Sequence, residues 1–166
     1  MAIICKIIKR SDGGIGYLHN MCRYVRDHRK ITFGGYGLNI EDPEIAFAEM
    51  VWIRKYYGQV STNPLIQIVV SFDEETDNIQ SATVLAPKIA SFFNNEYVYL
   101  WCIHHADKES AHYHMHLLLN SVNLNNGNLY HSSRYNMTGL CYHIEKLTHM
   151  QCHLIFWKEN MDECKE

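Results

Sequence analysis

The sequence predicts an α+β fold in which helices flank a central antiparallel β-sheet, and we expect residues 1–166 to form a single domain. Three observations support this fold class. The chain has 166 residues and is 47% hydrophobic, which is enough to build a substantial core. Apolar segments typical of strands alternate with segments of helical periodicity. Two of the strand segments follow each other across a short loop, which favours an antiparallel hairpin.

The first half of the chain predicts a strand followed by two helices. Residues 2–8 are β-branched and apolar, as expected of a strand. Residues 15–28 have apolar side chains at helical spacing. Three glycines within residues 34–37 predict a flexible loop. Residues 43–57 predict a second helix, with Asp42 as its N-cap and Pro43 in its first turn.

The second half predicts four strands and two helices. Residues 65–72 are almost entirely apolar and form a strong strand candidate. Residues 97–104 and 112–122 are joined by a loop at 106–111 and predict a hairpin. In chain order the second half reads strand, helix, strand, strand, helix, strand, over residues 65–72, 82–94, 97–104, 112–122, 137–149 and 153–157.

Charge is unevenly distributed along the chain. The net charge is −3, yet residues 1–30 hold seven Lys and Arg against two Asp. A basic N-terminal part beside an acidic remainder indicates one face built for a polyanion. The six cysteines are scattered, without a Cys-x-x-Cys pair, which favours a cytoplasmic chain with free thiols. We expect no membrane segment, because no apolar run approaches the roughly 18 residues that a span requires.

Histidines are concentrated between residues 101 and 120, where five of the 11 histidines occur. Three of them, His112, His114 and His116, alternate with other residues along a predicted strand. Side chains at this spacing project from one face of a strand, and imidazoles on one face can bind a divalent metal. We expect Mg²⁺ or Mn²⁺, with Zn²⁺ also possible. A third ligand from the neighbouring strand would leave one side open to substrate.

Three short motifs follow one another in a recognisable order along the chain. Residues 105–107 read His-Ala-Asp, and residues 114–120 read His-Met-His-Leu-Leu-Leu-Asn. This resembles the third motif of mobilisation relaxases, which belong to the HUH endonucleases: His-x-Asp followed by His-x-His, three apolar residues and Asn. Tyr24, with Lys30 downstream, resembles the first motif, in which a helix carries the tyrosine. Residues 70–72, Val-Ser-Phe, resemble the end of an early strand.

The resemblance implies roles for individual residues. Tyr24 would be the nucleophile, Asp107 would orient a histidine, and Asn120 would support the site. The segment between His-x-Asp and the final His-x-His is about two residues longer here than in the family, so two alignments are possible. An alignment on Asn120, which we prefer, gives His105, His114 and His116 as ligands. An alignment on the His-x-Asp pair gives His112 in place of His116.

The activity that this resemblance implies is metal-dependent nicking of single-stranded DNA at an origin of transfer. The tyrosine would remain covalently joined to the 5′ end, as in the mobilisation of a plasmid or mobile element in the bacterial cytoplasm. Arg23, Arg26, Arg29 and Lys30 would contact the DNA backbone. Accessory mobilisation proteins and a coupling protein are possible partners. The chain would be a naturally small relaxase or an excised catalytic domain.

Two alternatives remain open on the sequence. Rolling-circle replication initiators and small HUH transposases place the tyrosine after the histidines, where this chain has Tyr135 and Tyr142. A non-catalytic module that binds single-stranded nucleic acid would use the same sheet without a nucleophile. In the first alternative a C-terminal tyrosine carries the activity, and in the second no tyrosine does.

Overall fold

A computed structural model describes residues 2–9, 14–27, 31–60, 63–72, 78–105 and 112–158, with the side chains of the terminal strands described for residues 3–8 and 151–156. Over this part the chain forms six strands, four α-helices and one short 3₁₀ helix. In chain order these are β1 (Ala2–Lys9), α1 (Ile15–Val25), β2 (Thr32–Tyr36), α2 (Pro43–Tyr56), β3 (Leu65–Ser71), α3 (Ile79–Ala90), η1 (Ser91–Phe93), β4 (Tyr99–His104), β5 (His114–Asn120), α4 (Arg134–Thr148) and β6 (Gln151–Lys158).

All six strands belong to one sheet, in the order β2-β4-β5-β3-β1-β6. The predicted α+β class is therefore confirmed. The sheet is mixed rather than purely antiparallel, because β6 pairs in parallel with β1 at one edge. The predicted hairpin is also present, since β4 and β5 pair antiparallel along their whole length.

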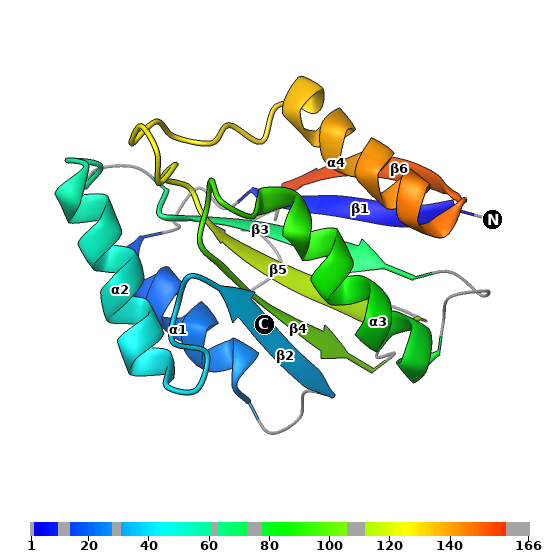
Figure 1. Cartoon of the computed structure of the whole chain (residues 1–166), viewed down its shortest axis with the longest axis horizontal. Coiled ribbons are helices and arrows are strands. Elements are labelled where there is room, and N and C mark those ends of the chain that lie inside the picture. Colours follow the sequence, from blue (N-terminus) through cyan, green and yellow to red (C-terminus); the bar gives the residue numbers. More distant parts are fainter. Residues whose placement is uncertain are drawn as a thin grey trace, which may run out of the picture.

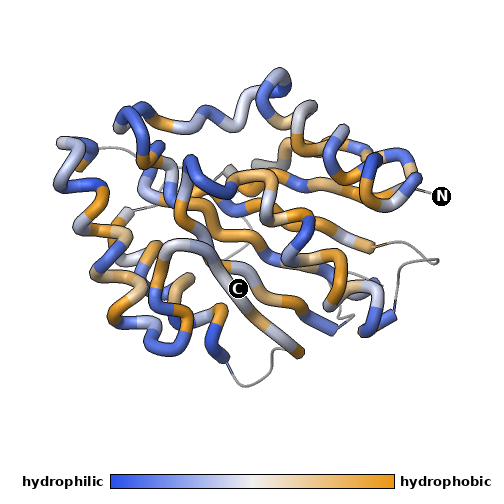
Figure 2. The backbone as a smooth tube through the Cα atoms, in the orientation of Figure 1, coloured by the Kyte–Doolittle hydropathy of each residue, from blue (hydrophilic) through white to orange (hydrophobic). Residues whose placement is uncertain are grey.

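Helices cover the two faces of the sheet unequally. Figure 1 shows α3 and α4 in front of the sheet, and their apolar residues join the larger core together with β1, β3, β4 and β5. On the other face α1 and α2 pack over β4, β5 and the start of β3 to form a smaller core. Figure 2 shows orange, hydrophobic segments both in the central strands and in the helices.

The glycine-rich segment at 34–37 was predicted as a loop, and here the structure differs. Gly34 and Gly35 lie within β2, which pairs antiparallel with β4. A Cβ atom at Gly34 would lie 2.6 Å from the Trp101 ring, so glycine is what allows this indole to lie against the strand. Glycine inside a strand often marks such a close approach.

Polar caps fix where three of the helices begin. The predicted cap of α2 is confirmed, because the Asp42 carboxylate accepts hydrogen bonds from the backbone N–H groups of Glu44 and Ile45. Asn78 and Ser133 cap α3 and α4 in the same way. Both helices therefore begin three residues earlier than their apolar periodicity predicted.

The sequence predicted free cysteine thiols and no membrane segment. Five of the six cysteines lie in the described part of the chain, and all five are free thiols. Across residues 2–158, the gaps excepted, no helix has the length and hydrophobicity needed to cross a bilayer.

Candidate metal centre

Three histidines meet where β4 ends and β5 begins. The antiparallel register pairs His104 with His114 and Cys102 with His116, so the three imidazoles form a triangle across the two strands. One nitrogen from each of His104, His114 and His116 lies within 4.8 Å of the other two. His114 is buried, with 4% of its surface exposed, and the other two are half-buried. This is a compact set of nitrogen donors that could hold one cation.

The third histidine of the cluster is His104 and not the predicted His105. His105 was the predicted partner of His114 and His116, but it is exposed, and its ring lies 5.5 Å from Tyr113. Neighbouring residues in a strand project to opposite faces, so His104 and not His105 shares the face of the pair. His112 is not in the cluster either, although its carbonyl oxygen lies 3.2 Å from the Nδ1 atom of His114.

Hydrogen bonds to Nδ1 orient two of the three rings. His114 Nδ1 can donate to the His112 carbonyl, which leaves Nε2 with its lone pair. The Gln67 Nε2–H group donates to His116 Nδ1 at 2.9 Å, and His116 Nε2 lies 3.4 Å from the Tyr24 hydroxyl. Metal-binding histidines usually have their second nitrogen fixed in this way. His114 therefore offers Nε2 to a cation as it stands, whereas His116 would do so once the Gln67 amide turns its oxygen toward Nδ1.

The donor set fits a divalent metal by its chemistry. Three neutral imidazoles can satisfy three positions of a catalytic metal and leave the remaining ones open to substrate. The buried Nε2 atom of His104 makes no hydrogen bond, which is consistent with a nitrogen set aside for a ligand. Imidazole donors suit Zn²⁺ better than Mg²⁺, which prefers oxygen.

Helix α1 brings Tyr24 to the histidines. Leu18, Cys22 and Val25 form the buried side of α1 and pack on the smaller core. Tyr24 lies beside this apolar side, half-buried, with its hydroxyl 3.3 Å from His104 Nδ1 and 3.4 Å from His116 Nε2. The tyrosine that the sequence singled out is therefore at the histidine centre, 80 residues away from His104 in the chain.

A second tyrosine on α1 completes a network that the sequence analysis missed. The Tyr17 hydroxyl contacts Gln67 Oε1, and the Gln67 amide in turn contacts His116. Tyr17 and Tyr24 are two helical turns apart, so they lie on the same side of α1. The sequence feature that could have indicated this network is Gln67, a single amide among the otherwise apolar residues 65–70 of β3.

The structure places Asn120, the predicted supporting residue, away from the histidines. It lies at the far end of β5, about 13 Å along the strand from His116, and its side-chain amide donates to the Met50 carbonyl in α2. The next residue, Ser121, accepts a hydrogen bond from the buried Arg54 side chain, whose pKa is lowered by burial. These contacts attach α2 to the end of β5 and do not reach the histidines.

The predicted DNA-binding arginines are engaged in ion pairs. Arg23 lies 2.6 Å from Glu44, and Arg26 lies 3.5 Å from Glu41 and over the Phe33 ring. The hydrogen bond from Arg23, followed by that from His19, holds the pKa of Glu44 below its ordinary value. A phosphate that approached either arginine would also meet its carboxylate partner. Arg29, Lys30 and Asp107 lie outside the described residues.

The C-terminal tyrosines lie on the opposite side of the sheet. Tyr135 and Tyr142 are 89% and 59% exposed on α4. The buried side of this helix, which includes Met137 and Ile144, packs into the larger core, away from the face that carries the histidine centre. Neither tyrosine is positioned next to the three imidazoles.

The chain matches the model of one protein family over most of its length. The family described as "Relaxase: MobA/VirD2-like, nuclease domain" matches residues 17–154. The matched segment begins in α1 and ends in β6, so it contains Tyr24 and all three clustered histidines. No curated protein matches the chain.

Proposed function

Because the chain belongs to the MobA/VirD2-like relaxase nuclease family, we propose that it nicks single-stranded DNA by transesterification at the histidine centre, with Tyr24 as the nucleophile. One observation supports this most strongly: the Tyr24 hydroxyl lies within 3.4 Å of two of the three clustered imidazoles. The biological role would be to start the transfer of a plasmid or mobile element in a bacterial cell. Accessory mobilisation proteins would assist it.

The proposed step exchanges one phosphodiester for another. The Tyr24 oxygen forms a bond to the scissile phosphorus while the bond from phosphorus to the 3′ oxygen breaks. The electron pair leaves with the 3′ oxygen, which takes up a proton and becomes a free hydroxyl. The phenolic proton passes to water, because the lone pairs of the neighbouring His104 and His116 rings would be used to hold the metal. No bond is hydrolysed, so a later 3′ hydroxyl can reverse the step.

His104, His114 and His116 would hold a divalent metal, which supplies Lewis-acid polarisation of a phosphate oxygen. The chain itself contributes orientation. Gln67 and the His112 carbonyl fix two of the rings, while the buried side of α1 fixes Tyr24. A phosphate over the histidine triangle would then lie next to the tyrosine hydroxyl, which is the arrangement that attack on phosphorus requires.

The test is to capture the covalent intermediate. Purified protein is incubated with Mn²⁺ and labelled single-stranded DNA from candidate origins, and the adduct is digested and mapped by mass spectrometry. We expect a Tyr24 peptide that carries the 5′ phosphate of the downstream fragment. DNA that binds without any cleavage under these conditions would favour a non-catalytic binding module.

The Gln67 contact leads to a prediction about metal affinity. Gln67→Leu should weaken Mn²⁺ binding by about 10- to 100-fold, because His116 loses the partner that fixes its ring. Gln67→Glu should keep or increase the affinity, because a carboxylate can accept a hydrogen bond from the Nδ1–H of a His116 ring that binds metal through Nε2. Isothermal titration calorimetry of folded variants measures both. Equal losses in the two variants would show that Gln67 matters for packing only.

The salt dependence of binding gives a second prediction. If about four phosphates are contacted, log affinity for single-stranded DNA should fall with log salt with a slope near roughly −3. The net charge of −3 would suggest weak electrostatic attraction, so a steep slope would locate the interaction on a locally basic face. Fluorescence anisotropy across a salt series measures the slope. A flat response would exclude substantial phosphate contact.

A further inference from the structure

An open strip of sheet surface leads from the histidine centre to the edge strand β6. In one row of paired residues, His114 is followed by Ser71, Ile4 and His153. In the adjacent row, His116 is followed by Val69, Lys6 and Ile155. Paired residues project to the same face of a sheet, so both rows share the face of the metal centre. We call these six residues of β3, β1 and β6 the transverse strip.

No helix in the described part of the chain covers the outer portion of this strip. The core on this face contains residues of α1, α2, β3, β4 and β5, but none of β1 or β6. Ile4 and Ile155 are 40% and 43% exposed, although both are large aliphatic residues. On the other face of β1, Ile3 and Ile7 are fully buried. The sheet therefore has one covered and one open side at this edge.

The side chains of the strip suit a single strand of nucleic acid. Ile4 and Ile155 offer apolar surface to the faces of unpaired bases, and the exposed His153 ring can stack on a base. The Lys6 ammonium and the Ser71 hydroxyl are suitable donors to phosphate oxygens. None of the six side chains is acidic, in contrast to the Glu41 and Glu44 carboxylates beside α1.

The dimensions also agree with a path for DNA. Neighbouring strands are about 4.8 Å apart, so Lys6 on β1 lies about 10 Å across the sheet from His116 on β5. A strand whose scissile phosphate sits at the histidines can therefore place its next nucleotides over β3 and β1. Such a path runs across the strands and ends at β6, beyond which no further strand pairs in the described sheet.

We propose that the transverse strip binds the single-stranded DNA that flanks the scissile phosphate. This inference rests on the proposed nicking function and adds to it a location for the bound strand. The strip holds the strand through aliphatic contact with bases and through Lys6 at the backbone. It thereby aligns the phosphate with Tyr24, and its contacts position DNA without reading its sequence.

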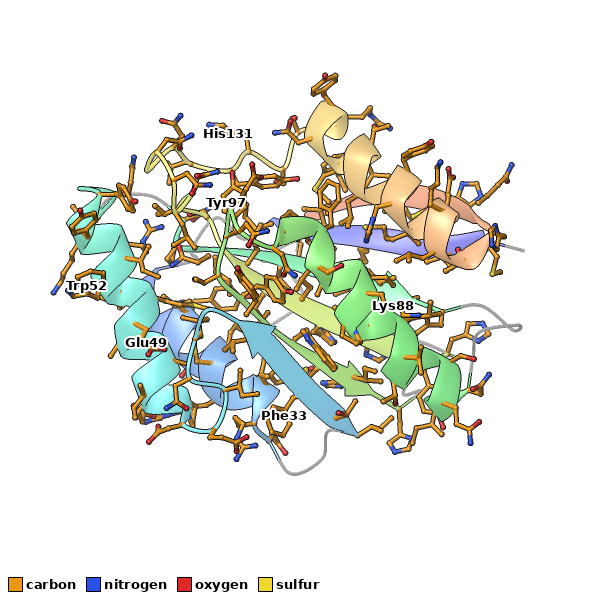
Figure 3. All side chains as sticks on the ribbon, viewed as in Figure 1. Phe33, Glu49, Trp52, Lys88, Tyr97 and His131 are labelled. Atoms are coloured by element: carbon orange, nitrogen blue, oxygen red, sulfur yellow. The ribbon has the colours of Figure 1, made fainter. Side chains whose placement is uncertain are left out.

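Matched variants test the strip. Ile155→Asp and Lys6→Glu should each weaken binding of a labelled single-stranded oligonucleotide by about tenfold at low salt, while Mn²⁺ affinity stays unchanged. The controls are Val84→Asp and Lys88→Glu, both on α3. Val84 is 54% exposed, and α3 lies in front of the sheet in Figure 3, on the face opposite to the strip. Unchanged binding in the strip variants, or equal losses in the controls, would overturn the proposal.

Crosslinking tests the same proposal without any substitution. Oligonucleotides with 4-thiothymidine at single positions are irradiated on the wild-type protein, and the attached peptides are identified by mass spectrometry. Crosslinks to β1 and β6 are expected, whereas crosslinks confined to α3 and α4 would overturn the strip. Adduct formation by Tyr24 is scored in the same samples. Loss of the adduct with β1 and β6 crosslinks retained would contradict the nicking function and leave the binding surface in place.

Discussion

Tyr24→Phe should abolish DNA cleavage and the covalent adduct, with activity reduced by at least about a thousandfold. The substitution removes the attacking oxygen and leaves the ring, which packs 5.0 Å from His104 and 5.4 Å from His116 between ring centroids. Binding of Mn²⁺ and of single-stranded DNA should therefore change little. The measurement combines a gel assay for the adduct with anisotropy and calorimetry on the same preparation.

The C-terminal tyrosines supply the control for this prediction. Tyr135→Phe and Tyr142→Phe should cleave at the wild-type rate, because both residues are exposed on α4. If Tyr24→Phe still forms the adduct and one of the α4 variants does not, the nucleophile follows the histidines, as in an initiator or transposase. That outcome would overturn the proposed role of Tyr24 and leave the three-histidine centre unaffected.

Much of the site follows from local sequence periodicity. The alternation of His114 and His116 along an apolar segment was enough to place both on one face of a strand, and the structure agrees. The proximity of Tyr24 came from family resemblance, because no local pattern relates α1 to a strand 80 residues later. Gln67 was missed for the same reason, since it meets His116 only through the pairing of β3 with β5.

The errors came from features that depend on strand register. The sequence alone does not show whether His104 or His105 lies beside His114 and His116. The pairing of His104 with His114 places His104 on the face of the cluster. β2 was taken for a loop because glycine is typical of turns, while its real constraint is the Trp101 ring that packs on it. The parallel pairing of β6 with β1 also joins the two ends of the chain, which periodicity cannot foresee.

The choice between His104 and His105 can be tested directly by metal binding. His104→Ala should reduce Mn²⁺ affinity by about 100-fold or more, because one of three nitrogen donors within 4.8 Å is lost. The matched variant His105→Ala removes an exposed ring on the other face and should change the affinity by less than about twofold. The double variant with His114 and His116 both changed to Ala should show no measurable binding while circular dichroism remains native. Calorimetry with Mn²⁺ measures all three variants. A loss on changing His105 that equals the loss on changing His104 would mean that the bound metal lies elsewhere than in this triangle.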